Sequence, residues 1–321
     1  MEYVTAANTI LSCVGAVCNL ANISVFLLQD WRTNNVTLTL LSLSITDFLL
    51  LVSCLVFDGF SILQTALPTS SFDFIAVKYY IVAWIVTLFS DISSLTTVLV
   101  SLERCLCIIT PLHVQSLFSV KRTLAALALV WFLVVLSYTV LFSTLTLQWR
   151  NNLSLNSSKL TVAVSKERMT VEMGHNIAHT VILPSFCELT VVINTIVMMV
   201  GLHRSSNFQK KSTQLASKHQ NNLSASSTKY KKLVVVVCSI SGVFIACNTP
   251  TVLFIYCKYF IPGFSYGGVY SQVYMVGIYV ILLLFATNAS ANFFVYCSLN
   301  RRFRDKLRDI LRCTASRPKL S

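Results

Sequence analysis

The stretch ISSLTTVLVSLERCLCIITPLH, residues 92–113, decides how this chain folds. It begins as an apolar run and ends in an adjacent acid and base, Glu103 and Arg104, where the run meets a polar segment. A charge in the middle of a bilayer costs roughly 2.5–3.5 kcal/mol on insertion scales, so a charged pair in such a run is expected to have a function. Glu103 can hold the Arg104 guanidinium or release it to another partner, which would make a switch with two positions. The alternative is an arginine that reaches the membrane interface beside a coincidental acid.

The composition around this stretch is that of an integral membrane protein. The 321 residues are 55% hydrophobic and 12% charged, whereas about a quarter of the residues in soluble domains are charged. The formal charge of +13 is not taken as a sign of nucleic-acid binding, because the basic residues are sorted between the two sides of a membrane. The eleven cysteines form no C-x-x-C pair and no metal-binding spacing with histidine, so we interpret them as small hydrophobic residues.

Seven runs are apolar enough to cross a bilayer, which needs about 20 residues. Backbone groups in lipid must be hydrogen-bonded within their own segment, so each run is expected to be an α-helix. The expected fold class is therefore an all-α membrane protein, a seven-transmembrane helix bundle with an amphipathic helix after the seventh span. The predicted spans are 5–29, 36–57, 75–109, 122–146, 174–203, 231–259 and 273–298, within a membrane domain of residues 1–298 that is followed by a tail of residues 299–321.

The basic residues predict the orientation of the bundle. Nineteen of the twenty-five Lys and Arg residues flank one set of span ends. Because Lys and Arg are in excess in cytoplasmic loops, that side is expected to face the cytoplasm. An odd number of spans places the two termini on opposite sides. We therefore expect a multi-pass plasma-membrane protein with its N-terminus outside and its C-terminus in the cytoplasm.

The segments outside the spans carry candidate modification sites. Residues 147–173 are expected to form an outer loop, in which Asn152 and Asn156 begin glycosylation sequons. Residues 299–313 place apolar side chains on one helical face and basic side chains opposite, which is the pattern of a helix lying on the inner leaflet. Cys313 at its end is a candidate for palmitoylation, or is simply a free cysteine.

Polar side chains inside the spans form a candidate cation site. Asp47 lies near the middle of the second run, and an ionised carboxylate at that depth needs partners or a cation. Hydroxyl and amide oxygens of Ser93, Asn288 and Asn292 would suit a hard cation such as Na⁺. The alternative is a structural hydrogen-bond network around Asp47.

Other polar residues and prolines in the spans are less specific. Asp91 and Glu188 can each face a cavity, the other acid, or a hydrated groove. Pro184 and Pro250 are expected to kink the fifth and sixth spans, because each removes a helical hydrogen bond. Kinked helices over a polar core can swing between packings, or the kinks can be static.

Taken in order, these residues resemble the rhodopsin-like (class A) G-protein-coupled receptors over about residues 10–312. No single match is specific, but eight matches in register are very specific. They are Asn19, Asp47, Glu103 with Arg104, Pro111 with Leu112, Trp131, Pro184, Pro250, and Asn292 with Tyr296 in the N-P-x-x-Y position. The resemblance implies that Glu103, Arg104 and Tyr296 control coupling to a heterotrimeric G protein. It also implies that the Asp47 set is a sodium pocket, with Na⁺ as an allosteric ion and no other cofactor.

The chain departs from the family pattern at several positions. Cys105 replaces the Tyr after the Arg, Asn248 replaces the aromatic residue before the sixth-span proline, and Phe293 replaces the seventh-span proline. The usual third-span Cys falls at Tyr79, and residues 147–173 contain no Cys. A disulfide of this kind is typically worth about 2–5 kcal/mol. The outer loop is therefore expected to be looser or to be held in another way.

The resemblance restricts the ligand. A retinal Schiff base needs a Lys in the seventh span, where Ala286 stands, and amine receptors place an Asp where Val86 stands. The short segment before the first span favours a small peptide or a small chemosensory molecule over a large protein hormone. In its general sequence pattern, the chain is similar to divergent invertebrate peptide-like and chemosensory receptors. The candidate ligand-pocket residues are Trp84, Val86, His179, Tyr256 and Tyr274, which can instead be packing or interfacial-belt residues.

The expected function is therefore that of a receptor whose extracellular ligand, a small peptide or other small molecule, activates a heterotrimeric G protein. The alternative class is a membrane transporter or channel, which the acids in the spans would support. Transporters usually show repeated halves, and the seven runs show no repeat. No H-E-x-x-H, G-x-S-x-G or phosphate-loop motif occurs, so an enzyme is not expected.

Overall fold

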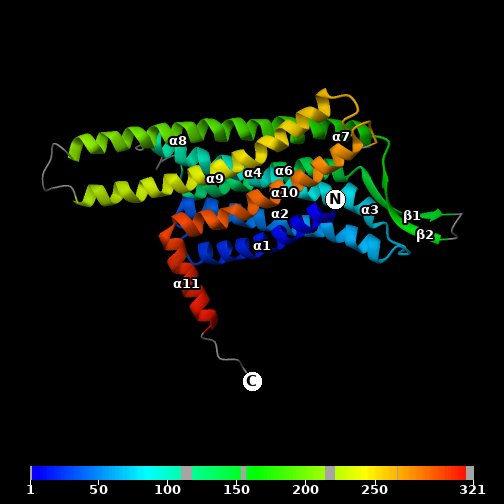
Figure 1. The fold of residues 1–321 in the computed structure, drawn as a ribbon, viewed down its shortest axis with the longest axis horizontal. Helices are drawn as coiled ribbons and strands as arrows, with labels where there is room; N and C mark the ends of the chain where they lie inside the picture. The colour runs from blue at the N-terminus through cyan, green and yellow to red at the C-terminus, as the bar shows by residue number, and fades with distance from the viewer. Residues whose placement is uncertain (1, 110–117, 153–156, 214–220, 266, 316–321) are drawn as a thin grey trace, which may run out of the picture.

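The computed structural model of the protein describes residues 2–109, 118–152, 157–213, 221–265 and 267–315. Seven helical segments that are long and apolar enough to cross a membrane run side by side along the molecule (Figure 1). The predicted seven-helix bundle is therefore confirmed. The seven segments are Tyr3–Leu27, Asn35–Ala66, Phe74–Ile109, Val120–Phe142, Arg168–Gly201, Val234–Phe260 and Ser271–Leu299.

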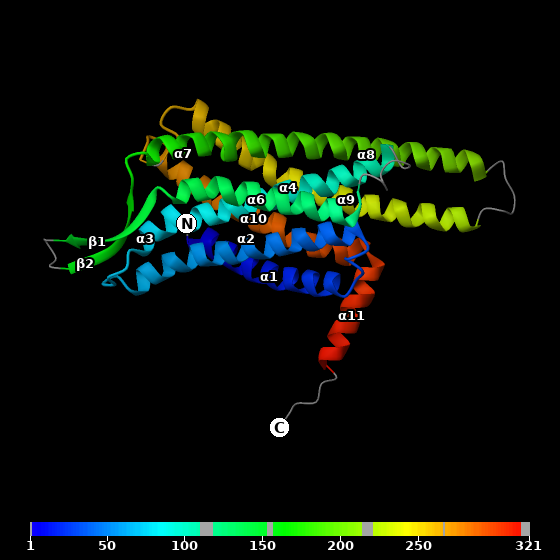
Figure 2. The ribbon, with the colours of Figure 1, turned by 180° about the vertical axis from the view of Figure 1, so that it is seen from behind.

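The described part of the chain contains the following elements. The helices are α1 (Glu2–Leu27), α2 (Asn35–Ala66), α3 (Phe74–Val77), α4 (Ala83–Ile109), α6 (Val120–Phe142), α7 (Arg168–Asn176), α8 (Leu183–Thr213), α9 (Asn221–Phe260), α10 (Ser271–Leu299) and α11 (Arg301–Ala315), with π-helical turns η1 (Lys78–Val82) and η2 (Ile177–Ile182) and strands β1 (Leu145–Asn152) and β2 (Ser157–Val164). The strands project from one end of the bundle and α11 leaves from the other (Figures 1 and 2). We call these the hairpin end and the α11 end.

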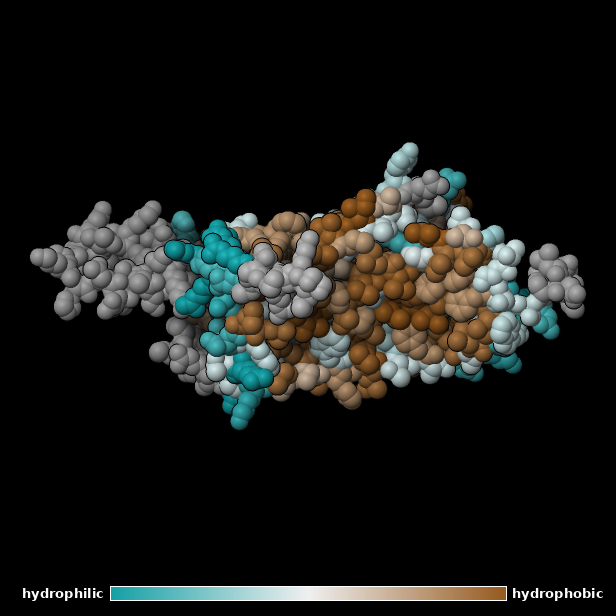
Figure 3. Space-filling view, turned by 90° about the horizontal axis from the view of Figure 1, so that it is seen from below, coloured by the Kyte–Doolittle hydropathy of each residue, from teal (hydrophilic) through white to brown (hydrophobic). Residues whose placement is uncertain are grey.

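Helix α4 carries the stretch that opened the sequence analysis and lies at the centre of the bundle. It contacts α2, α6, α8 and α9, whereas α1 packs mainly on α2 and α10. An apolar belt covers the middle of the molecular surface and hydrophilic side chains gather toward its ends (Figure 3). Exposed apolar residues on α6, such as Phe132 and Leu136, contribute to that surface. Such a belt suits contact with lipid hydrocarbon.

The second span is longer than its apolar run. The sequence predicts an end at residue 57, before Asp58, but α2 continues to Ala66. The continuation is possible because the Asp58 carboxylate accepts hydrogen bonds from Asn8 Nδ2 at 2.7 Å and Thr9 Oγ1 at 3.0 Å, both on α1. A buried acid with such partners does not have to end a helix.

Side chains pack closely where α1 meets α10. A Cβ added to Gly15 would lie 2.0 Å from the Ser290 hydroxyl oxygen and 3.0 Å from Ser290 Cβ, so a larger residue would force the Ser290 side chain to move. One turn further along α1, Asn19 Nδ2 donates to the Gly15 carbonyl at 3.0 Å and to the Ala289 carbonyl at 2.9 Å. The first span is therefore joined to the seventh by a buried amide.

The region predicted to be an outer loop is folded. Strands β1 and β2 form an antiparallel hairpin in which Leu145 pairs with Val164 and Trp149 pairs with Leu160. The hairpin follows from the alternation of apolar and polar residues along LTLQW and KLTVAV. The sequence analysis missed this signal because it treated the segment as a spacer between spans.

The hairpin is attached to the segment before the third span without a disulfide. All ten cysteines that the structure describes are free. Instead, Leu160 N–H donates to the Ser71 carbonyl at 2.7 Å, and Asp73 N–H donates to the Leu160 carbonyl at 3.0 Å. The Asp73 carboxylate accepts from Thr161 Oγ1 at 2.9 Å and also caps α3 by accepting from Ala76 N–H at 3.0 Å. The sequence analysis expected this loop either to be looser or to be held in another way. The structure shows that it is held in another way.

At the opposite end, α11 is anchored to the bundle by a buried aromatic side chain. Phe303 is fully buried and its ring centroid lies 5.6 Å from those of both Phe26 and Tyr296. Charged residues on the other side of α11, such as Arg301 and Arg308, are exposed. This arrangement fits the predicted amphipathic helix after the seventh span.

The attachment of the hairpin predicts the effect of substituting Asp73. Asp73→Ala removes a helix cap, worth about 0.5–2 kcal/mol, and the side-chain bond to Thr161, worth about 1 kcal/mol. We expect amide hydrogens of β2 to exchange about tenfold faster, as measured by hydrogen–deuterium exchange. Thr161→Ser, which keeps the hydroxyl, serves as the control. Unchanged exchange in Asp73→Ala would show that the backbone bonds alone hold the hairpin.

Candidate functional site

The predicted switch is an ion pair buried at the α11 end of α4. Arg104 Nη2 lies 2.6 Å from Glu103 Oε1, and the two residues are 4% and 1% exposed. Glu103 Oε1 also accepts a hydrogen bond of 2.5 Å from Asn35 Nδ2 at the start of α2. Asn35 in turn donates to the Phe118 carbonyl at 3.2 Å. Glu103 therefore links α4 to α2 and to the segment that leads into α6.

The guanidinium of this pair is only partly satisfied. Among the residues that the structure describes, Arg104 Nε is buried and has no hydrogen-bond partner. A buried charged group with an unmet donor costs free energy that another acceptor can recover. The arrangement thus leaves Arg104 able to gain a partner if the helices around it separate.

Three of the four predicted cation-site residues meet in the centre of the bundle. Asp47 on α2 is fully buried, and its carboxylate accepts from Ser93 Oγ at 2.6 Å and from Asn292 Nδ2 at 2.8 Å. These bonds join α2 to α4 and α10. Asn288 makes no hydrogen bond with the set within the described residues.

The donor atoms of this set suit a hard cation. The atoms that could coordinate one are all oxygens: the two Asp47 oxygens, the Ser93 hydroxyl and Asn292 Oδ1, which is buried with no partner in the described chain. Hard cations prefer oxygen ligands of this kind. The nearby Tyr296 hydroxyl is also buried and lacks a partner among described residues. The residues present therefore fit Na⁺, with Asn288 outside the set.

A second buried acid, Asp91, lies two residues before Ser93 on α4. Its Oδ2 accepts from the Tyr138 hydroxyl of α6 at 2.8 Å and lies 2.8 Å from His179 Nδ1 in η2. The His179 ring stacks on His175, with centroids 4.2 Å apart and an interplanar angle of 12°. Asp91 thus joins the third, fourth and fifth spans, and it faces His179 and Tyr138 rather than Glu188.

Another acid within the spans, Glu188, is partly buried and joins the fifth and sixth spans. Its two carboxylate oxygens accept from Asn248 Nδ2 at 2.8 Å and from Thr249 Oγ1 at 2.5 Å. Asn248 and Thr249 directly precede Pro250, which lies inside α9. The position where the family places an aromatic residue is therefore occupied here by a hydrogen-bonded amide.

A small cavity of about 40 Å³ lies between these acid-centred contacts. Its polar lining includes Asp91, His179 and Asn248, and hydroxyl side chains supply most of the remainder. The hydroxyl-bearing residues are Thr87, Ser90, Ser94, Thr180 and Thr251. A site of this size holds about three water molecules, each needing roughly 10–15 Å³. It is a polar recess that a larger ligand would have to widen.

The structure places the predicted ligand-pocket residues at different sites. His179 lines the cavity and the other four do not. Trp84 contacts His175 edge-on, and Val86 is buried in the core beside Phe57 and Leu282. The other two make aromatic contacts near the hairpin end: Tyr256 also meets Ser185 Oγ at 3.1 Å, and Tyr274 stacks on Phe254.

The remaining predicted residues lie as follows. Pro184 is the second residue of α8, directly after the π-helical turn η2, and it lines the cavity. Asn152 is the last residue of β1 and pairs with Ser157. Asn156 and the side chains of Asn152 and Cys313 lie outside the described part of the chain. Glycosylation, palmitoylation and the kinks therefore stay predictions.

The Asp91 cluster was missed by sequence reasoning, although its parts were visible. A carboxylic acid within an apolar run needs partners, and Tyr138 and His179 are polar groups in neighbouring runs. What the sequence did not provide was the rotation of each helix about its axis, which decides the pairing.

Comparison with known families agrees with this geometry. Residues 18–296 match the family model of the 7 transmembrane receptor (rhodopsin family). The match covers most of the chain, and the chain therefore belongs to this family of G-protein-coupled receptors. It is a multi-pass plasma-membrane receptor, not an enzyme, that binds an extracellular ligand and signals through G proteins. No curated protein matches the chain.

The Asp91 cluster predicts a stability effect at Tyr138. Tyr138→Phe removes a donor to a buried carboxylate, and hydrogen bonds to charged groups are worth about 1.5–3 kcal/mol. We expect a thermal unfolding midpoint several degrees lower for the purified receptor, as followed by intrinsic fluorescence. Tyr259→Phe, at an exposed position on α9, is the control. An unchanged midpoint in Tyr138→Phe would mean that Asp91 is satisfied without this bond.

Proposed function

We propose that this receptor binds a small peptide or a small chemosensory molecule in the Asp91 cavity, and that binding releases Arg104 to activate a heterotrimeric G protein. One observation carries the proposal: both charges of the Glu103 and Arg104 pair are buried, yet Arg104 Nε has no partner among the described residues. A pair held in this way is restrained but can gain an acceptor from outside the bundle. The proposed acceptor is on the G protein.

The proposed orientation places the hairpin end outside the cell and the α11 end in the cytoplasm. Its support is the distribution of Lys and Arg, nineteen of which flank the α11 end of the spans. The N-terminus would then be extracellular, and the exposed arginines of α11 would meet the anionic inner leaflet.

The ligand class follows from the lining of the cavity. An acid, an imidazole and several hydroxyl groups converge there, and such groups recognise a ligand portion that carries hydrogen-bond donors. About 40 Å³ accommodates only a small group in this packing. A peptide would therefore insert one polar side chain or its terminal amine, whereas a small molecule would enter as a whole.

The contacts around the cavity offer a route from ligand to switch. A donor on the ligand would compete with His179 for Asp91, and a group near Asn248 would disturb its bond to Glu188. Both bonds involve η2 or α8, so either change alters how the fifth span packs on its neighbours. Arg104 lies thirteen residues beyond Asp91, or about 20 Å along the helix. Because α4 also contacts α9, a shift of α9 can change the packing around both the Asp91 cavity and Arg104.

Sodium would act on the same equilibrium. A cation held by Asp47, Ser93 and Asn292 would tie α2, α4 and α10 together, because one residue comes from each helix. Binding that favours one packing stabilises it by mass action. We propose that Na⁺ favours the packing seen here, in which Arg104 is paired.

The switch predicts opposite effects of two substitutions on signalling without ligand. Glu103→Gln keeps an acceptor but removes the charge, so the paired state should weaken by at least 1 kcal/mol, which shifts a two-state equilibrium about fivefold. We expect basal second-messenger production in transfected cells to rise about fivefold. Arg104→Ala should abolish it, because the proposed G-protein contact is lost.

Both values are normalised to receptor at the cell surface, and Glu167→Gln at an exposed position outside the spans is the control. Basal signalling that is the same in wild type, Glu103→Gln and Arg104→Ala would refute the switch.

The cation site predicts a sodium effect that depends on one carboxylate. In wild type, replacing choline chloride by NaCl at constant ionic strength should raise the thermal unfolding midpoint of the purified receptor by several degrees. Asp47→Asn removes the only formal charge among the donors, so its midpoint should not respond to Na⁺. Asp58→Asn, at the hairpin end of α2, is the matched control and should respond like wild type. A response that persists in Asp47→Asn would place the ion elsewhere.

A further inference from the structure

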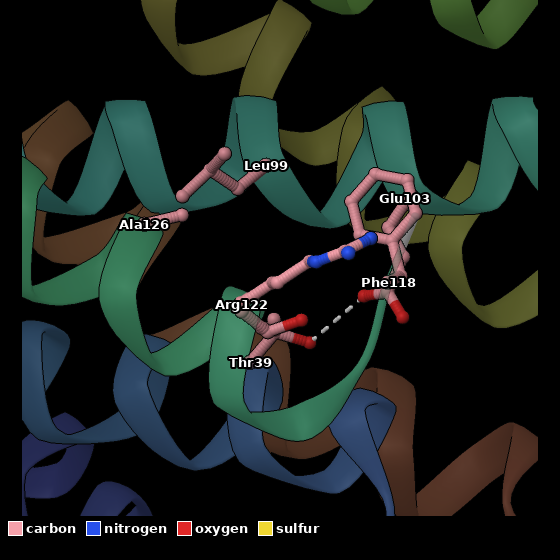
Figure 4. Close-up of a pocket in the computed structure, with 7 residues that line it drawn as sticks. Thr39, Leu99, Glu103, Phe118, Arg122 and Ala126 are labelled. Atoms are coloured by element: carbon pink, nitrogen blue, oxygen red, sulfur yellow. Dashed lines mark hydrogen bonds between the residues drawn. The ribbon is translucent and has the colours of Figure 1, made fainter. Parts of the chain in front are cut away.

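A larger cavity lies at the α11 end, away from the Asp91 recess. Its volume is about 240 Å³, and it is lined by residues of α2, α4 and α6 together with Phe118 (Figure 4). Volumes of roughly 300–1,000 Å³ are usual for drug-sized ligands, so this cavity suits a smaller molecule. One of its walls is Glu103, the residue that holds Arg104.

The polar part of the cavity has unmet hydrogen-bonding capacity. Thr123 is 6% exposed, and its hydroxyl has no partner among the residues that the structure describes. The two oxygens of Glu103 are unequally used within the described residues: Oε1 accepts from Arg104 and Asn35, whereas Oε2 accepts a single long bond of 3.5 Å from Thr39. A donor placed in the cavity would therefore find an acceptor at Oε2 and a second polar contact at Thr123.

The rest of the lining restricts the charge of the occupant. Leu99, Ala126 and the ring of Phe118 supply apolar surface, and the Arg122 side chain runs along the cavity toward Phe118 and Glu103 (Figure 4). The lining carries one charge of each sign, from Arg122 and Glu103, so a buried cation or anion gains little net attraction to offset its desolvation. A neutral molecule avoids that desolvation cost.

We infer that this cavity is an allosteric site for a neutral, fragment-sized amphiphile. The donor of the ligand contacts Glu103 Oε2 and the Thr123 hydroxyl, and its apolar body packs on Leu99 and Phe118. The contact gives Glu103 Oε2 a closer donor than Thr39 in the packing where Glu103 holds Arg104. A ligand that binds this packing preferentially stabilises it, so, resting on the proposed function, bound ligand lowers basal signalling.

The test uses two probes that differ in one donor. 4-Propylphenol has about ten non-hydrogen atoms, so a contribution of about 0.4 kcal/mol per atom gives an affinity of about 1 mM, and 4-propylanisole has the same body without the hydroxyl donor. We expect 4-propylphenol, and not 4-propylanisole, to raise the thermal unfolding midpoint of the full-length receptor in a saturable way. It should also lower basal activation of purified G protein by reconstituted receptor.

Three variants locate the site. Ala126→Leu fills the cavity and should weaken 4-propylphenol binding about tenfold or more, and Thr123→Val should weaken it while keeping the shape of the side chain. The matched control is Ala125→Leu, an exposed neighbour on α6 that does not line the cavity, which should bind like wild type. If Ala126→Leu fails to fold, Thr123→Val carries the comparison.

Each outcome bears on the inference. Equal midpoint shifts for the two probes, or equal shifts in wild type, Ala126→Leu and Thr123→Val, would overturn the site. Donor-dependent binding that leaves basal signalling unchanged would overturn the regulatory role, provided that Glu103→Gln raises signalling in the same assay. If Glu103→Gln also has no effect, the failure belongs to the proposed function, and the binding result alone supports or overturns the site.

Discussion

The buried ion pair between Arg104 and Glu103 is the interaction on which the rest of this structure depends. Removing two charges from water is costly, and an ion pair compensates for that cost only when further hydrogen bonds complete it. Glu103 receives that help from Asn35, which ties it to α2, while the guanidinium is left with one buried donor that has no partner in the described chain. The Glu103 carboxylate thus has a hydrogen-bond donor from another helix, whereas the Arg104 Nε donor has no acceptor in the described chain. That imbalance makes Arg104 the group that can change partners.

Other acids within the spans also join helices: Asp47 and Asp91 are buried, and Glu188 is partly buried. Asp91 joins the third, fourth and fifth spans, Glu188 joins the fifth and sixth, and Asp47 joins the second, third and seventh. In each case the carboxylate sits in an apolar surrounding and accepts hydrogen bonds from neighbouring helices. Helices that would otherwise meet only through apolar contacts, which are not directional, acquire fixed registers. A ligand or ion that competes for one carboxylate therefore acts on the relation between helices.

Much of this could be predicted from the sequence, because hydropathy and depth within a run determine it. The seven spans follow from run length. The residues expected to form a cation site were Asp47, Ser93, Asn288 and Asn292, of which the structure joins Asp47, Ser93 and Asn292 by hydrogen bonds. The ligand residues were harder, because the direction of a side chain depends on rotation about the helix axis. Val86 precedes Asp91 by five residues, which turns it about 140° away, while Thr87, four residues before Asp91, lines the cavity. Trp84 is on a similar side of α4 but about two turns nearer the hairpin end.

Two other features lay beyond the sequence analysis for physical reasons. The π-helical turns η1 and η2 change the helical phase by contacts with other segments, which no single run reveals. The attachment of the hairpin through Asp73 and Leu160 pairs residues about ninety positions apart. Without the family cysteines, the outer loop was expected to be looser or to be held in another way, and an acid and two backbone bonds hold it.

The most direct test of the account is the separation of α4 and α9 at the α11 end. Spin labels carried by non-natural amino acids at exposed positions Ile109 and Val235 would report that distance by double electron–electron resonance in wild type and in Glu103→Gln. The account predicts that removing the charge of Glu103 moves part of the distance distribution to longer values. Identical distributions in the two proteins would contradict the claim that this ion pair restrains the helix packing.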